Sequence, residues 1–200
     1  MKNLLWGVLA LLALGLIGFG VWYSRVQSAA RQWEKPVAEI LSEKLEKDAD
    51  TIAIEFSSRI DAPVDTVFRA LTEPERMQEF SETVRYSKLL RSEGNQKAIE
   101  LDMVVLGQPQ RVAIEFTFLP AEHRVTFKTL ESQFSDFSGE YRLTPSPDRA
   151  KTLLTYTGTA KDKVKLPIPL AFQKSALRET FVSTIRALKK GIAAQQSLPG

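Results

Sequence analysis

The sequence contains no cysteine and a single histidine among its 200 residues. Because cysteine is absent, neither disulfide bonds nor thiolate metal sites are available, and the fold depends on a hydrophobic core. The one histidine, His123, stands beside Glu122 and Arg124 in a segment typical of a solvated turn. A histidine-based triad or a zinc centre would therefore need unusual partners. A glycine-rich phosphate loop is also absent from the sequence, so we predict no catalytic residue, no metal and no cofactor.

The longest apolar run is N-terminal and extends from Leu4 to Tyr23, which is 20 residues without a charge or a proline. At about 1.5 Å rise per residue, a helix of this length spans roughly 30 Å, the thickness of the hydrocarbon core of a bilayer. Tryptophans near both ends match the positions of interfacial aromatic belts. We predict a transmembrane anchor over residues 1–25. The alternative is a signal peptide cleaved after Ser28, although such peptides have a shorter apolar region.

The charges that flank this run give a weak signal for its orientation. Lys2 and the α-amino group lie on one side, and Arg25, Arg31 and Lys35 lie on the other, so the positive-inside rule nearly balances. A short tail before a first hydrophobic helix usually stays in the cytoplasm. We therefore expect a single-pass membrane protein whose following domain is extracytoplasmic.

Residues 26–50 are predicted to form a polar spacer that carries a short helix. The apolar residues of this spacer recur at helical spacing, and they are Trp33, Val37, Ile40, Leu41 and Leu45. Such a stripe is typical of a helix that packs one face on a neighbour.

From residue 51 the hydrophobic period changes to two. Ile52, Ile54 and Phe56 alternate with other side chains, which indicates a strand with one buried face. Two short helices follow, the second from Glu73 to about Phe80, and then come strand-like segments separated by turn residues. The predicted segments cover residues 83–91, 96–106, 110–119, 123–131, 135–144 and 151–161.

The chain ends in a long amphipathic helix predicted from about Pro169 to Ala194. Its apolar stripe consists of Leu170, Leu177, Phe181, Ile185, Leu188 and Ile192. A sheet with one apolar face needs a cover, and this helix is the only predicted element long enough. We predict an α+β domain over residues 51–195 with an antiparallel seven-stranded sheet, followed by a tail of residues 196–200.

Several short motifs mark the boundaries of these elements. Ile60-Asp61-Ala62-Pro63 ends the first strand, Gly139–Pro145 and Thr152–Tyr156 form the last hairpin, and Leu166–Pro169 leads into the closing helix. Together with the order of the elements, these motifs resemble the START-like superfamily, also called SRPBCC or the birch-pollen-allergen fold. Within it the chain looks most like the polyketide cyclase/dehydrase and coenzyme Q-binding branch, and the resemblance covers about residues 52–192.

The resemblance implies a helix-grip fold, in which a curved antiparallel sheet wraps round the long C-terminal helix. Such a fold encloses an apolar cavity for lipids, quinones, sterols or polyketides. It does not imply one activity, because it hosts binders, transfer proteins and enzymes. Tyr141 stands where relatives often have tryptophan, and Ser132-Gln133 replaces a frequent Leu-Gly, so the branch stays open.

Alternation places one set of apolar side chains on the inward face of the strands. An ordinary packed core is one interpretation of this set. The other is that a curved sheet holding one helix leaves a cavity, whose aromatic and methionine walls suit a flexible apolar ligand. Tyr86 and Tyr141 could each present a hydroxyl to a ligand carbonyl. The predicted ligand-binding residues are Phe80, Tyr86, Met103, Phe116, Phe118, Phe127, Tyr141 and Phe181.

Positive charge is concentrated towards the C-terminus, where residues 161–200 carry eight basic and two acidic side chains. This is typical of a solvated helix with cations at its C-terminal dipole, or of a docking surface for anionic lipid headgroups. Nucleic acid is not an expected partner, because the patch lacks interleaved aromatic residues and any reading motif. The clustered basic residues are Lys161, Lys163, Lys165, Arg186, Lys189 and Lys190.

These observations predict membrane-tethered binding or carriage of a hydrophobic small molecule, such as a lipid or an isoprenoid quinone. Two alternatives are a cyclase- or dehydratase-type enzyme on the same fold and a protein-interaction module. We favour a binder or carrier over an enzyme, because few acid–base groups fall on the inward face of the predicted strands.

Overall fold

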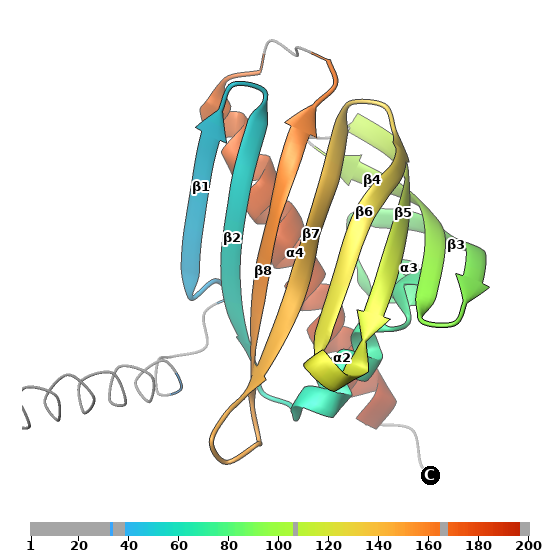
Figure 1. Ribbon diagram of the computed structural model, residues 1–200, viewed down its shortest axis with the longest axis vertical. Coiled ribbons are helices and arrows are strands. Elements are labelled where there is room, and N and C mark those ends of the chain that lie inside the picture. The colour runs from blue at the N-terminus through green and yellow to red at the C-terminus, as the bar shows by residue number, and fades with distance from the viewer. Residues whose placement is uncertain (1–32, 34–38, 106–107, 165–167, 197–200) are drawn as a thin grey trace, which may run out of the picture. The chain divides into compact units, whose positions relative to one another are not determined.

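The computed structural model describes residues 33, 39–105, 108–164 and 168–196 (Figure 1). The predicted anchor between Leu4 and Tyr23, and residues 26–32 and 34–38 of the predicted spacer, lie outside these residues. No helix among the described residues is long and apolar enough to cross a membrane. The chain separates into the units Met1–Val37 and Ala38–Gly200, and the description below concerns the second.

Eight antiparallel strands form one sheet with the spatial order β1-β2-β8-β7-β6-β5-β4-β3. The strands are β1 (Ser42–Asp48), β2 (Thr51–Ile60), β3 (Val84–Glu93), β4 (Gln96–Val105), β5 (Gln108–Leu119), β6 (Arg124–Ser132), β7 (Ser135–Pro145) and β8 (Thr152–Asp162). The helices are α2 (Val64–Leu71), η1 (Pro74–Arg76), α3 (Met77–Phe80), η2 (Pro120–Glu122) and α4 (Leu170–Gln196). In Figure 1 the sheet curves in front of α4. The predicted α+β class, the long closing helix and the six later strands are confirmed, with strand ends within two residues.

The sheet has one strand more than predicted, because part of the expected helical spacer is a strand. β1 pairs with β2 in continuous register from Ser42 opposite Ser57 to Asp48 opposite Thr51. The leucine, lysine and glutamate residues of this segment favour a helix when taken alone. Pairing with the open edge of β2 satisfies the backbone groups of both strands, and this tertiary interaction overrides the local preference.

The main core lies between α4 and the concave face formed by β2, β8 and β7. Phe181 of α4 stacks on Phe56 of β2 with ring centroids 4.7 Å apart, and Ile185 is fully buried beside them. The predicted stripe on α4 is confirmed from Leu177 onwards. Its first member, Leu170, is exposed instead, because it lies at the first turn of the helix.

A second apolar cluster covers the part of the sheet that α4 does not reach. It is formed by β3 to β6, with Ile99, Phe116 and Val125 among its buried members. Phe68 of α2 and Met77 of α3 pack against it. The two short helices therefore close the concave face beside α4, and most of the side chains around the space between the clusters are apolar.

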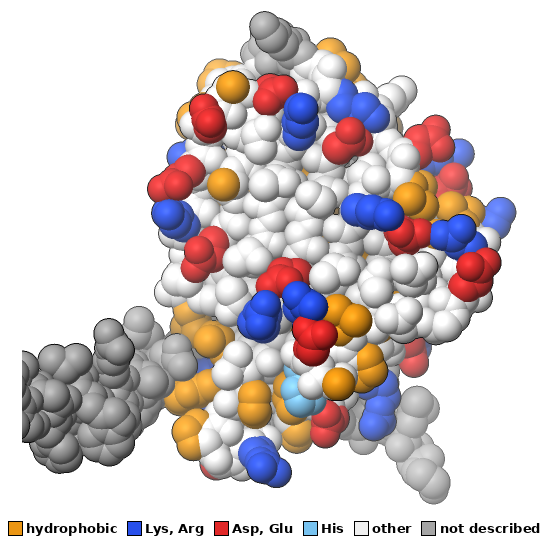
Figure 2. All heavy atoms as spheres, in the orientation of Figure 1, with side chains coloured by type: hydrophobic (Ala, Val, Ile, Leu, Met, Phe, Trp, Pro, Cys, Tyr) orange, Lys and Arg blue, Asp and Glu red, His pale blue; other side chains and the backbone are white. Residues whose placement is uncertain are grey.

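The outer face of the sheet is solvated. Figure 2 shows acidic and basic side chains of both signs scattered over this face, with uncharged surface between them. Glu115 is the buried exception among the described residues of β5. It forms ion pairs with Lys128 at 2.9 Å and with Arg91 at 2.6 Å. These cations lower the pKa of its carboxyl group.

Two glycines face each other where β7 and β8 approach most closely. Gly139 is opposite Gly158 in the register of the two strands. A Cβ atom at Gly139 would clash with the carbonyl oxygen of Thr157, and one at Gly158 would lie 2.6 Å from the carbonyl oxygen of Ser138. The sheet can bend here only because neither position carries a side chain.

We expect the substitution Gly139→Ala to lower the free energy of unfolding by about 1–3 kcal/mol, because the strands must separate to admit the methyl group. Chemical denaturation measures the change. The exposed neighbour Ser138 serves as the control, since Ser138→Ala at the surface should change stability by less than about 0.5 kcal/mol. Equal effects at the two positions would contradict the close approach.

Candidate ligand-binding cavity

A cavity of about 310 Å³ lies between the concave face of the sheet and α4. Its lining residues on α4 extend from Gln173 to Gln195, which is roughly 30 Å along a helix. Most of the lining is apolar and comes from all layers of the domain, including Ile54 of β2, Val112 of β5 and Leu177 of α4. The space is therefore long, narrow and suited to an extended apolar molecule.

Six of the eight predicted ligand-binding residues line this cavity, and they are Phe80, Met103, Phe116, Phe127, Tyr141 and Phe181. Phe118 is buried but lies outside the lining, in the second apolar cluster, where its ring is stacked 6.4 Å from that of Phe116. Tyr86 is also outside the lining, and its side chain is exposed.

A bulge at the start of β3 explains the position of Tyr86. Val84 lies opposite Met103, but Tyr86 lies opposite Asp102, so Arg85 is an extra residue between them. In a regular strand Tyr86 would share the inward face of Val84. The inserted residue turns Tyr86 outward and brings Ser87 inward, where the Ser87 hydroxyl donates to the carbonyl oxygen of Pro74.

Tyr156 of β8 is a lining residue that was not among the predicted site residues. It lies directly opposite Tyr141 in the pairing of β7 and β8, with the ring centroids 5.4 Å apart. Phe127 completes an aromatic cluster, at 5.5 Å from Tyr141 and 5.8 Å from Tyr156. The alternation of Leu154, Tyr156 and Ala160 along β8 is the sequence signal that would have placed it on this face.

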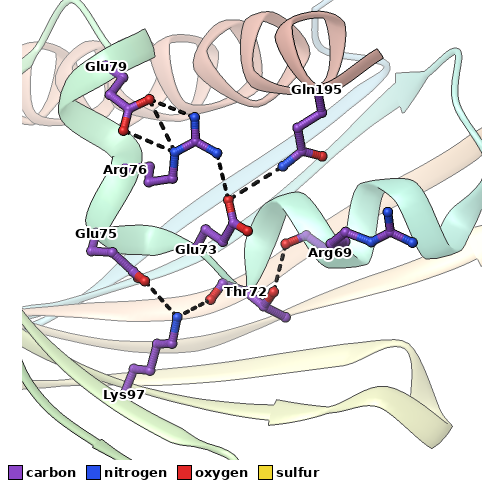
Figure 3. A network of polar contacts seen from close by, with 8 residues as sticks. All are labelled: Arg69, Thr72, Glu73, Glu75, Arg76, Glu79, Lys97 and Gln195. Atoms are coloured by element: carbon purple, nitrogen blue, oxygen red, sulfur yellow. Dashed lines mark hydrogen bonds and ion pairs between the residues drawn. The ribbon is translucent and has the colours of Figure 1, made fainter. Parts of the chain in front are cut away.

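A polar network forms one end of the cavity (Figure 3). Arg76 lies between two carboxylates, 2.9 Å from Glu73 and 2.8 Å from Glu79, and it lowers the pKa of Glu79 through these contacts. Gln195 of α4 points towards Glu73, to which its amide donates at 3.5 Å. Lys97 of β4 donates to the carbonyl oxygen of Thr72 at 2.7 Å. The network ties the short helical segment to α4 and to the sheet.

The opposite end of the cavity is at the start of α4. Asp162 and Gln173 line it, and the Lys47 ammonium group donates to both, at 3.3 and 2.9 Å. Two apolar side chains beside this end are solvent-exposed, Leu170 and Phe172, the latter by 61%. Polar groups at both ends are therefore engaged with protein partners, and the middle of the cavity is left to aromatic and aliphatic side chains.

The sequence profile of the family described as "Polyketide cyclase / dehydrase and lipid transport" matches residues 51–193. The chain belongs to this family. The match spans β2 to α4 and so includes every element that lines the cavity. A search of curated proteins found no match.

Several solved structures have the same fold. The Zhui aromatase/cyclase from Streptomyces sp. R1128 is similar with a TM-score of 0.66 and 16% identity, covering 75% of this chain and 98% of that one. A START superfamily protein from Mycobacterium smegmatis has a TM-score of 0.60 and 18% identity, covering 72% and 98%. Major latex-like protein 151 from Panax ginseng has a TM-score of 0.55 and 14% identity, covering 76% and 100%. At these identities the likeness concerns the fold alone.

In this member of the polyketide cyclase/dehydrase and lipid transport family, the two cavity tyrosines are held in an apolar environment. Tyr141 borders the cavity and is otherwise enclosed by protein, and this burial raises the pKa of its phenol to about 12. Burial and the neighbouring Tyr141 also raise the pKa of Tyr156. Both phenols are therefore neutral at physiological pH and act as hydrogen-bond donors.

His123 lies at the surface, as the sequence indicated. Its backbone is left-handed with a φ of 46° at the end of η2, and its Nε2 atom is 3.3 Å from the carboxylate of Asp65. It is not among the residues that line the cavity. Among the described residues, no group of three His, Cys, Asp or Glu side chains could hold a metal ion.

The raised pKa of Tyr141 predicts a loss of stability at alkaline pH. The phenol ionises near pH 10 in the unfolded chain but only near pH 12 in the folded one. Its contribution is thus complete below pH 10 and decreases as the pH rises from 10 towards 12. The free energy of unfolding should therefore fall between pH 8 and 11.5, as measured by denaturant unfolding. In Tyr141→Phe we expect this fall to be smaller by about 2 kcal/mol. Tyr86→Phe is the exposed control, and an equal effect of both substitutions would contradict the burial of Tyr141.

Proposed function

We propose that this protein binds or carries a hydrophobic small molecule in its cavity while tethered to a membrane. The observation that carries the proposal is the apolar cavity of about 310 Å³ between the sheet and α4. Membership of a family whose description includes lipid transport supports it. The length of the lining along α4 favours an extended ligand, and a lipid or an isoprenoid quinone has this shape.

The apolar run from Leu4 to Tyr23 supports the tether. Glu39, which follows this run in the chain, forms an ion pair with Arg186 of α4 at 2.5 Å. The 15 residues between Tyr23 and Glu39 can span at most roughly 50 Å. On this proposal the tether keeps the cavity close to a bilayer, which is a reservoir of apolar ligands. On this proposal the domain lies on the extracytoplasmic side.

Apolar side chains beside one cavity end support an exchange of ligand with the bilayer. Leu170 and Phe172 are exposed next to the lining residues Ile168 and Gln173. Exposed apolar side chains at the mouth of a site are a common feature of surfaces that contact membranes. Ligand that leaves the cavity at this end would pass over apolar surface.

Binding of anionic headgroups by the basic C-terminal residues stays a weaker part of the proposal. Several of these residues form ion pairs within the domain, Lys163 with Asp136 at 3.3 Å and Lys190 with Glu82 at 2.9 Å. Arg186 likewise pairs with Glu39. These pairs neutralise much of the positive charge that the sequence concentrates here.

A cyclase-type enzyme is the second candidate, because the family description includes cyclases and dehydrases. The charged groups that line the cavity are at its ends, where protein partners hold them. Glu73 binds Arg76 and Gln195, and Asp162 binds Lys47. Such charge-paired groups are poorly placed to exchange protons with a ligand in the middle of the cavity, so binding is favoured over catalysis.

A substitution that fills the cavity tests the proposal. Ala176 of α4 is buried and lines the cavity, so Ala176→Phe places a ring in the ligand space. The full chain, purified in detergent and extracted with organic solvent, should yield a bound apolar molecule by mass spectrometry. We expect the amount per protein to fall at least tenfold in Ala176→Phe.

The matched control is Ser175→Phe, which adds the same ring on the exposed side of α4. This variant should retain as much bound molecule as the original chain. If all three proteins carry equal amounts, the extracted material is lipid from the micelle rather than a cavity ligand, and the proposal is wrong.

A further inference from the structure

Two tyrosine side chains, Tyr141 and Tyr156, line the cavity and bring phenol hydroxyls to it. Tyr156 is 9% exposed and Tyr141 borders the same space. Within the described residues, neither hydroxyl forms a hydrogen bond. Both hydroxyls are therefore available to a molecule in the cavity, because a phenol that faces the cavity without a protein partner can donate a hydrogen bond to a ligand there.

The fold holds the two phenol rings side by side, with their centroids 5.4 Å apart. Tyr141 and Tyr156 are directly opposite in adjacent strands, so their side chains project from the same face of the sheet. The absence of a side chain at Gly158 makes room for the Tyr156 hydroxyl, which would lie 3.0 Å from a Cβ atom at that position. Phe127 packs against both rings and limits their movement.

The chemistry of this pair selects the kind of group that it can bind. Neutral phenols donate hydrogen bonds, and a carbonyl oxygen has two lone pairs that can accept from two donors. A carboxylate is disfavoured, because the charged lining groups Glu73, Arg76 and Asp162 already bind protein partners and an uncompensated charge in an apolar site is costly. A plain hydrocarbon would leave both hydroxyls unpaired.

We propose that Tyr141 and Tyr156 together bind a neutral carbonyl group of the ligand, so that the ligand class is an apolar ketone, quinone or ester. This inference rests on the proposed function and refines it. It assigns the middle of the cavity to the polar group of the ligand and the aromatic and aliphatic walls on either side to its apolar parts.

The matched probes 9-fluorenone and fluorene differ only in the carbonyl group and test this assignment. The full chain is titrated with each probe at fixed detergent concentration, so that partition into micelles is the same for every variant. We expect 9-fluorenone to bind more tightly than fluorene, and this preference to fall roughly three- to tenfold in Tyr141→Phe and in Tyr156→Phe. Affinity for fluorene should stay unchanged, because both rings remain.

An infrared spectrum of bound ¹³C-labelled 9-fluorenone gives a signature that a merely structural role would not produce. The carbonyl stretch should shift to lower frequency in the original chain and return towards its micelle value in the double variant. Tyr86→Phe, which removes an exposed hydroxyl outside the cavity, should change neither measurement. Equal affinity for both probes, unaffected by either cavity substitution, overturns the assignment while leaving the proposed function intact. Failure of both probes to bind the original chain overturns the proposed function and the assignment together.

Discussion

The packing of α4 against the concave face of the sheet is the interaction on which the other features depend. Phe56, Phe181 and Ile185 form its centre, and Phe56 and Ile185 have no exposed surface. A single helix covers only part of a sheet of this width. The remaining part is covered by α2 and α3, two short helices that each contact α4. The cavity is the space that two separate covers leave between them.

Most of the fold could be predicted from the sequence because its signals are local. Alternating side chains mark β2 and β4 to β8, turn residues separate them, and a long stripe marks α4. The pairing of Ser42–Asp48 with β2 could not be predicted in this way. A segment rich in glutamate, lysine and leucine has a helical preference, and only the open edge of a neighbouring strand makes it extended.

The cavity lining was predictable to the extent that each strand keeps its period. Phe116, Phe127 and Tyr141 lie where alternation places them. Tyr86 does not, because one inserted residue in β3 reverses the side chains that follow it up to a second bulge after Leu89, and no residue pattern marks such a bulge. Tyr156 carries an ordinary alternation signal, but its significance comes from lying opposite Tyr141, and that register depends on the length of the turn between β7 and β8.

The added strand β1 also changes what the sheet presents to other molecules. It precedes the part of the chain that matches the family profile and is the edge of the sheet beside β2. An edge strand offers unpaired backbone groups to any passing strand. Lys44 and Glu46 project from β1 into solvent. A second strand that paired with β1 would bring its own side chains close to these two charged groups. At the other edge, two bulges interrupt β3. Both edges thus discourage strand exchange between copies of the domain.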